Sequence, residues 1–211
     1  MAQRTLTQIF KNCEAQLPPI NGQFRQPTDV TWDAQGNTYI SDGYINSRVA
    51  KFDKNGDWVK SFGEPGDQPG QLNTPHGIAN DAQGNIYVAD ESNNRIQKFD
   101  PRGSFLTKWG REGSGPGQFK SPWGIACDAL GNVYVVDSGN HRVQKFDGNG
   151  TFLCAFGNRG KTDAQMNFPY GIAVDKQGCV FVVDSGNGRV LKYVPTDEEQ
   201  NRGKQEPAKA Q

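Results

Sequence analysis

The stretch PHGIANDAQGNIYVADESNNRIQKFDPRGSFLTKWG, residues 75–110, decides the fold. Its apolar residues fall into four short runs that are rich in Ile, Val, Tyr and Phe, and we expect strands at residues 77–80, 86–89, 95–99 and 105–109. Turn-forming pairs, Gly84-Asn85 and Arg102-Gly103, separate the first run from the second and the third from the fourth. Four short strands joined by tight turns predict one four-stranded antiparallel sheet.

This stretch is one of four copies of the same text. The copies begin at prolines spaced 48, 47 and 47 residues apart, namely Pro27, Pro75, Pro122 and Pro169. No window of ten residues shows the periodicity of an amphipathic helix. Four-stranded sheets that repeat every 40–50 residues or so are the blades of a β-propeller. We therefore expect an all-β propeller with copies near residues 27–63, 75–110, 122–157 and 169–194.

The two ends of the chain depart from the repeat in complementary ways. The fourth copy holds only three strand-like runs and ends at Tyr193, whereas residues 4–10, RTLTQIF, resemble the fourth run of the second copy, SFLTKWG. We expect residues 4–10 to complete the sheet of the fourth copy and to close the ring, since an unpaired blade edge invites aggregation. The propeller would then span residues 1–194, and the polar segment 195–211 is expected to be disordered.

Charge and composition indicate which kinds of partner and which cellular compartment to expect. The 211 residues hold 23 Lys and Arg against 23 Asp and Glu, so the chain is formally neutral, which disfavours a nucleic-acid partner. No apolar run reaches the roughly 18 residues of a membrane span, and the first residues lack the apolar core of a signal peptide. We therefore expect a cytoplasmic protein whose four cysteines are reduced thiols; an extracellular disulfide pair is the alternative.

The repeat text resembles a known family. The pattern P-x-G-I-A-x-D…G-N-x-Y-V-x-D-S-x-N-x-R-I/V-x-K-F is similar to the NHL repeat, and the resemblance covers roughly residues 21–194. NHL propellers usually have six blades, whereas this chain encodes about four. Three explanations of this small number of blades stay open. The ring is small, or chains associate into a homo-oligomer, or the chain is part of a longer ancestral propeller.

A narrower resemblance covers the first two copies. The segments QPTDV, SDGYINSR and TPHGIA are similar to peptidyl-α-hydroxyglycine α-amidating lyase. That family is a zinc-dependent propeller that cleaves hydroxyglycine-extended peptides into a peptide amide and glyoxylate. The resemblance implies a catalytic role for Tyr44 and a zinc-ligand role for His76.

The remaining zinc ligands of that family have no counterpart here. The family holds zinc with three histidines, each in a Pro-His motif, and a catalytic zinc generally needs three protein ligands and one open position. The residues that follow the four repeat prolines are Thr28, His76, Trp123 and Tyr170. The other histidine, His141, lies in a turn between second and third strands, which we expect to lie away from the entrance to the inner strands. No cofactor is therefore established by the sequence, and zinc remains an open alternative.

Two further sets of residues suggest roles. Trp123 and Tyr170 predict an aromatic face suited to ligand contact, with packing between blades as the alternative. One Asp and one Arg recur in every copy, which predicts that they pin each blade through hydrogen bonds rather than bind a substrate. Arg48 is set apart as a ligand-binding candidate because it shares a loop with Tyr44. The recurring residues are Asp42, Asp90, Asp137 and Asp184 with Arg48, Arg95, Arg142 and Arg189.

These observations predict a protein- or peptide-binding scaffold. The alternative is a zinc-dependent, amidating-lyase-like C–N lyase that keeps Tyr44 and His76 and takes its other ligands from another chain or from missing blades. A lactone hydrolase is suggested by propeller architecture alone, and architecture does not fix function. The sequence leaves open the identity of the ligand and whether four blades close by themselves.

Overall fold

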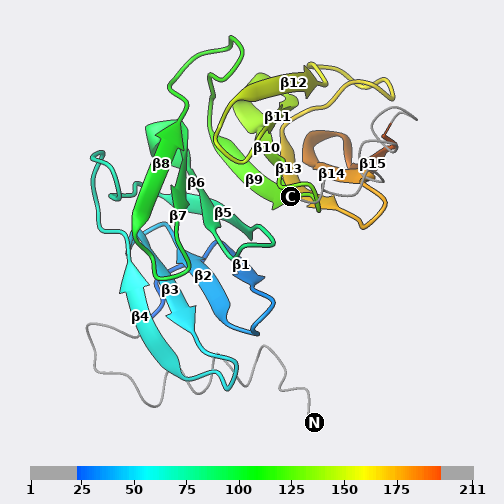
Figure 1. Cartoon of the computed structure of the whole chain (residues 1–211). Coiled ribbons are helices and arrows are strands. Elements are labelled where there is room, and N and C mark those ends of the chain that lie inside the picture. Colours follow the sequence, from blue (N-terminus) through cyan, green and yellow to red (C-terminus); the bar gives the residue numbers. More distant parts are fainter. Residues whose placement is uncertain (1–22, 196–211) are drawn as a thin grey trace, which may run out of the picture.

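The computed structural model describes residues 23–195, which form four antiparallel sheets that we call blades 1 to 4 in chain order (Figure 1). In each blade the strands are hydrogen-bonded in the order of the sequence. The strands are β1 (Asp29–Trp32), β2 (Thr38–Asp42), β3 (Arg48–Phe52) and β4 (Trp58–Phe62) in blade 1; β5 (Pro75–Asn80), β6 (Ile86–Asp90), β7 (Arg95–Phe99) and β8 (Phe105–Trp109) in blade 2; β9 (Pro122–Cys127), β10 (Val133–Asp137), β11 (Arg142–Phe146) and β12 (Phe152–Phe156) in blade 3; and β13 (Pro169–Val174), β14 (Val180–Asp184) and β15 (Arg189–Tyr193) in blade 4.

The strands predicted for the second copy are confirmed, with two differences in length; β6 ends one residue later than expected, at Asp90. β5 starts two residues earlier than expected because Pro75 pairs with Asp90 across a bulge that ends at Ile78. Single turns of 3-10 helix follow β6, β10 and β14: η1 (Glu91–Asn93), η2 (Ser138–Asn140) and η3 (Ser185–Asn187). Over residues 23–195 no helix has the length and apolar character needed to cross a membrane.

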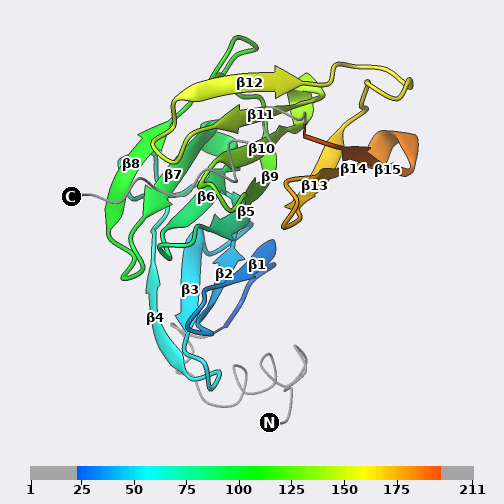
Figure 2. The ribbon, with the colours of Figure 1, turned by 45° about the vertical axis from the view of Figure 1, so that its right-hand side comes forward.

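The four blades follow one another around an arc (Figures 1 and 2). The inner strands β1, β5, β9 and β13 lie next to one another in this order, whereas β13 does not pack against β1 in a comparable way. The structure thus confirms the four-bladed propeller architecture. The segment expected to close the ring, residues 4–10, and the tail from residue 196 onward lie outside the described residues.

Apolar clusters between neighbouring blades form the core. The cluster between blades 2 and 3 contains Tyr87, Phe119 and Phe146, none of which is accessible to solvent. Burial of one such side chain stabilises the fold by roughly 1.5–3 kcal/mol. Among residues 23–195, no further blade packs on the far side of blade 4. One repeat position shows the consequence, since Val143 of blade 3 is fully buried, whereas Val190 of blade 4 is 62% exposed.

A buried Asp at the end of the second strand organises each blade, as the recurrence predicted. Oδ1 of Asp90 accepts the backbone N–H of Asn73, and Oδ2 accepts hydrogen bonds from Nε of Arg95 at 2.6 Å and Nε2 of Gln97 at 3.0 Å. Arg95 also donates to the carbonyls of the preceding loop. The same ion pair joins Asp42 to Arg48, Asp137 to Arg142 and Asp184 to Arg189. A fully buried carboxylate of this kind fixes the loop that leads into its blade.

Tyrosine hydroxyls also join blade 1 to blade 2 and blade 2 to blade 3. Tyr39 of blade 1 donates its hydroxyl to the Pro101 carbonyl of blade 2, and Tyr87 donates to the Gly148 carbonyl of blade 3. In blade 4 the same repeat position holds Phe181, which has no hydroxyl group.

A second hydrogen bond between neighbouring blades involves the side chain of the residue that follows the 3-10 turn. Oδ1 of Asn94 accepts the backbone N–H of Ser121 at 2.9 Å, and Nδ1 of His141 accepts that of Phe168 at 3.0 Å. Blade 4 has Gly188 at this position. Both side chains that reach toward the following blade are therefore replaced in blade 4.

The cysteines of the described residues form no disulfide. Cys179 is buried, Cys127 is half-buried and Cys154 is exposed. Burial raises the pKa of the Cys127 thiol far above its ordinary value, so that thiol stays protonated. Cys13 lies outside the described residues.

Candidate functional site

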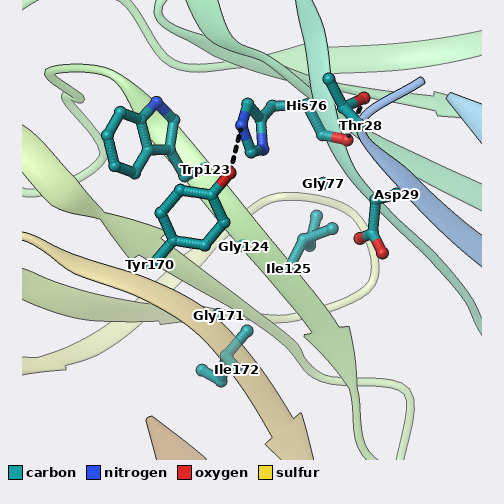
Figure 3. Close-up of a pocket in the computed structure, with 10 residues that line it drawn as sticks. All are labelled: Thr28, Asp29, His76, Gly77, Trp123, Gly124, Ile125, Tyr170, Gly171 and Ile172. Atoms are coloured by element: carbon teal, nitrogen blue, oxygen red, sulfur yellow. Dashed lines mark hydrogen bonds between the residues drawn. The ribbon is translucent and has the colours of Figure 1, made fainter. Parts of the chain in front are cut away.

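Three rings meet where the inner strands of blades 2, 3 and 4 begin (Figure 3). His76 and Trp123 lie nearly parallel, with 5.6 Å between ring centroids and 18° between planes. Trp123 and Tyr170 follow at 4.9 Å, and the Tyr170 hydroxyl lies 3.3 Å from Nε2 of His76. We call these three residues the aromatic cluster. Since each directly follows a repeat proline, the cluster arises from equivalent positions in three copies.

Glycines bring the three rings together. Gly77 and Gly124 follow His76 and Trp123, and each lies against the backbone of the next inner strand. A Cβ on Gly124 would lie 2.6 Å from the Tyr170 carbonyl oxygen, and one on Gly77 would overlap the Trp123 carbonyl oxygen. The absence of a side chain therefore lets β5, β9 and β13 approach closely enough for their first side chains to touch.

A cavity of about 140 Å³ adjoins the aromatic cluster. Figure 3 shows the rings on one side of it and Asp29 on the other. Oδ2 of Asp29 accepts the Ile78 N–H at 3.0 Å, and Oδ1 accepts the Val30 N–H at 2.8 Å. The cavity is lined by Thr28, Asp29, His76, Gly77, Trp123, Gly124, Ile125, Tyr170, Gly171 and Ile172.

Asp29 is the cavity residue that sequence reasoning missed. It occupies the position at which the other three copies have glycine, Gly77, Gly124 and Gly171. The sequence held a signal for this role in the change from glycine to aspartate. Because the other three blades form with glycine at this position, the blade fold does not require an aspartate there.

The environment sets the charge of each group in the site. His76 is 4% exposed, and burial lowers its pKa even though Glu91 acts in the opposite direction, so the imidazole is neutral near pH 7. Burial, together with Tyr44 and Asp29, raises the pKa of Tyr170. Desolvation raises the pKa of Asp29, and two backbone N–H groups counteract this shift. The site therefore presents a neutral imidazole, a neutral phenol and one carboxyl group.

Tyr44 lies at the rim of this site. It belongs to the turn between β2 and β3, is 55% exposed, and points an edge toward His76 with 6.1 Å between the ring centroids. The structure thus places the two residues implied by the lyase resemblance, Tyr44 and His76, next to each other.

The other predicted positions serve to join elements. Arg48 pairs with Asp42 at 3.1 Å and donates to the carbonyl of Gln23, and it does not line the cavity. The Thr28 hydroxyl lies 2.8 Å from the Pro75 carbonyl oxygen and 3.0 Å from that of His76. Thr28 therefore connects blade 1 to blade 2, while its side chain also borders the cavity.

The expectation for the His141 turn needs correction. The turn between second and third strands lies at the same edge of the blade as the start of the inner strand, because the strands are antiparallel and Asp137 pairs with both Pro122 and Arg142. His141 is kept out of the site by its direction: its Nδ1 accepts the Phe168 N–H, and its ring packs on Phe168 at 4.5 Å.

The residues present do not fit the three-histidine zinc site of the lyase family. Within residues 23–195 no group of three or more His, Cys, Asp or Glu side chains is placed to hold a metal ion. In the cavity, Trp123 and Tyr170 occupy the positions where further histidines would be needed, and Asp29 is engaged by two backbone N–H groups. The geometry instead favours contact with apolar and hydrogen-bonding groups of a ligand.

Comparison with known proteins agrees with this reading of the repeats. The family model described as NHL repeat matches residues 72–99, 119–146 and 166–193. Two curated relatives from Xenopus laevis, peptidyl-glycine alpha-amidating monooxygenases A and B, are 48% identical over 42 residues, which is 19% of this chain. That match covers only 4% and 5% of those two proteins.

Solved structures share the fold at low sequence identity. A streptogramin B lyase matches with a TM-score of 0.61 and 18% identity over 81% of this chain, and an auxiliary nutrient binding protein from Bacteroides thetaiotaomicron matches with 0.62 and 16% over 80%. The chain spans 55% and 47% of the length of these two structures. The chain therefore carries NHL repeats at residues 72–99, 119–146 and 166–193, and its described residues form a β-propeller of four blades.

Proposed function

We propose that this propeller is a binding module for a peptide or an extended segment of a protein, and that the ligand binds at the aromatic cluster and the adjoining cavity. The observation that carries the proposal is the contact of His76, Trp123 and Tyr170 beside a cavity that also exposes the Asp29 carboxylate. Aromatic residues with a polar group are the residues that most often dominate the energy of protein interfaces.

The size of the cavity favours a peptide over a small molecule. Pockets that enclose small ligands usually measure about 300–1,000 Å³. The cavity here is about 140 Å³, which is room for one side chain while the rest of the ligand lies on the surrounding face. Tyr44, which is 55% exposed and lies against His76, extends that face beyond the cavity. The neutral chain gives no support to a phosphate-bearing ligand.

Selection from a displayed library of random peptides tests this proposal, followed by calorimetry on the selected peptides. We expect Trp123→Ala to weaken binding by a factor of ten or more, since truncation of a central aromatic residue costs about 2 kcal/mol or more. Trp32→Ala is the matched control, because Trp32 is 67% exposed and does not line the cavity. Selected peptides that bind the Trp123→Ala protein as tightly as the native chain would contradict the proposal.

A zinc-dependent lyase activity is the second candidate, supported by the position of Tyr44 beside His76 and by the short match to amidating monooxygenases. It requires ligands from another chain or from missing blades, because the described residues supply one histidine to the cavity. Metal analysis of the purified protein is the test. Less than one zinc per two chains, together with an unchanged unfolding temperature after chelation, rules this candidate out.

A further inference from the structure

The cavity beside the aromatic cluster has one acidic wall. Among the described residues that line it, Asp29 carries the one carboxyl group, and none is a Lys or an Arg. Figure 3 shows this carboxyl group across the cavity from the rings of Trp123 and Tyr170. Part of Asp29 stays accessible to solvent. A group bound in the cavity would therefore meet aromatic rings on one side and a carboxyl group on the other.

The Asp29 carboxylate can accept more hydrogen bonds than it does. Its two oxygens accept one backbone N–H each, from Val30 at 2.8 Å and from Ile78 at 3.0 Å, which leaves one lone pair on each oxygen. No Lys or Arg of residues 23–195 forms an ion pair with it. The carboxylates that organise the blades differ in this respect, since each is paired with an arginine, as Asp90 is with Arg95. Asp29 is therefore held in place by the backbone and lacks a positive partner among the described residues.

The charges that act on the polar rings of the site are acidic. Burial lowers the pKa of His76, and Glu91 opposes this shift. Burial raises the pKa of Tyr170, and the nearby Tyr44 and Asp29 add to the rise. No Lys or Arg of residues 23–195 contributes to either shift. The local electrostatic potential is therefore negative, which attracts cations to the cavity and disfavours anions.

The rest of the lining suits the stem of a long basic side chain. Ile125 and Ile172 line the cavity together with three glycines, so part of its surface is apolar. Lys and Arg carry methylene groups that pack on apolar surface and a charged end that seeks a polar partner. Aromatic faces attract such charged ends, and Trp attracts them most strongly. The cavity therefore offers both parts of a basic side chain a complementary surface.

We infer that the side chain anchored in this cavity is a Lys or an Arg of the bound peptide, with its cationic end between the Asp29 carboxylate and the rings of Trp123 and Tyr170. This inference deepens the proposed function and rests on it for the peptide that carries the side chain. A carboxylate that already faces the cavity offsets the cost of removing the cation from water. The neutral imidazole of His76 adds no repulsion.

Amino-acid derivatives test the cavity without any peptide. The N-acetyl methylamides of lysine and arginine are titrated into the full chain, with the norleucine derivative as an uncharged control of similar shape. The NMR signal of the Trp123 indole N–H, assigned with Trp123→Phe, reports binding. A single side chain should bind with a dissociation constant in the millimolar range. We expect at least one basic derivative to bind at least about ten times more tightly than the norleucine derivative.

Equal binding of the basic and norleucine derivatives overturns the inference. Absence of a Trp123 shift with both basic derivatives at their solubility limit also overturns it.

Variants of Asp29 show whether the carboxylate makes this distinction. Asp29→Asn removes the charge, and Asp29→Gly introduces the residue found at this position in the other three blades, so that variant should fold. In both, the preference for the basic derivative over norleucine should fall to about one, since the charged partner is gone. Asp163→Asn is the matched control, because it removes the same charge from a fully exposed side chain outside the cavity. An undiminished preference in both Asp29 variants overturns the inference.

Peptides selected from the displayed library separate this inference from the proposed function. We expect them to share one basic position, and its replacement by norleucine should weaken binding at least about tenfold. Peptides that depend on Trp123 but bind the native and Asp29→Asn proteins equally would support the proposed function and overturn the inference. If no peptide is selected while the basic derivatives still bind through Asp29, the cavity is a cation site and the proposed peptide-binding function fails.

Discussion

The hydroxyl of Tyr170 lies 3.3 Å from Nε2 of His76, although 94 residues separate the two positions. They belong to blades 4 and 2, which are not neighbours, and the indole of Trp123 in blade 3 contacts both rings. The site therefore depends on the curvature of the arc of blades and not on the structure of any single blade. A change in the angle between two blades would separate these rings even if every sheet stayed intact.

Glycine substitutions test this close approach of inner strands. We expect Gly77→Ala and Gly124→Ala to destabilise the fold by about 1–3 kcal/mol each, since the new methyl group would meet the backbone of the next strand. Gly171→Ala is the matched control. Its Cβ would lie 3.5 Å from Val183, an ordinary contact, so its effect should range from neutral to a stabilisation of about 0.5 kcal/mol.

Urea unfolding of the three glycine variants measures these differences. A loss of stability in Gly171→Ala equal to that of Gly124→Ala would show that another strand packs on β13. Native stability in Gly77→Ala and Gly124→Ala would contradict the strand spacing described above.

The hydrogen bond between the Phe168 N–H of blade 4 and His141 of blade 3 can be tested by replacing His141. Because Nδ1 of His141 accepts the Phe168 N–H, His141→Ala should lower the free energy of unfolding by about 1–2 kcal/mol through an unpaired N–H and lost ring contact. His141→Asn should retain most of the stability, since Asn94 makes the same bond to Ser121 in blade 2. Equal losses in both variants, measured by thermal unfolding, would contradict this role.

Stability should fall in mild acid because of the two histidines. Burial lowers the pKa of His76 and His141 in the folded protein below the ordinary value of 6.5. Below pH 6.5 the unfolded chain therefore binds more protons than the folded chain, and the free energy of unfolding decreases as the pH falls through the folded pKa values. Above this range the contribution is constant.

The measurement compares urea midpoints at pH 7.5 and 5.5. The native chain should lose more stability between these values than His141→Asn, which keeps its hydrogen bond and cannot titrate there. An identical pH dependence in both proteins would show that His141 is not a contributor.

The buried ion pairs should matter far more than exposed ones. Asp90→Ala leaves the Arg95 guanidinium buried without its carboxylate, and loss of one partner of a buried pair typically costs about 3–5 kcal/mol. Arg102→Ala breaks the pair with Asp100, but Arg102 is 87% exposed, so the loss should stay below about 0.5 kcal/mol. Comparable losses in the two variants, by chemical denaturation, would refute the structural role of the Asp90 network.

Much of the fold could be predicted from the sequence because the four copies of the repeat can be compared with one another. Alternation in the strands and glycine in the turns recur at fixed spacing, and a residue present in every copy, such as Asp90, serves the blade. Angles between blades leave no local signal, so the contact of His76 with Tyr170 could not be foreseen. The direction of His141 depends on its left-handed backbone and on Phe168, neither of which is encoded by the turn motif alone. Asp29 was visible as a departure from glycine, but its place in the cavity follows from its bond to Ile78.

The replacement of both tethering side chains in blade 4, by Phe181 and Gly188, has a consequence for how the site behaves over time. In a linear stack of repeats, the unit at the end has one stabilising neighbour and is the first to fray. Among the described residues, blade 4 packs on one neighbouring blade and carries Tyr170, so each local unfolding of blade 4 removes one wall of the cavity. Ligand binding in the cavity and local unfolding of blade 4 therefore exclude each other, and a bound ligand would stabilise this blade.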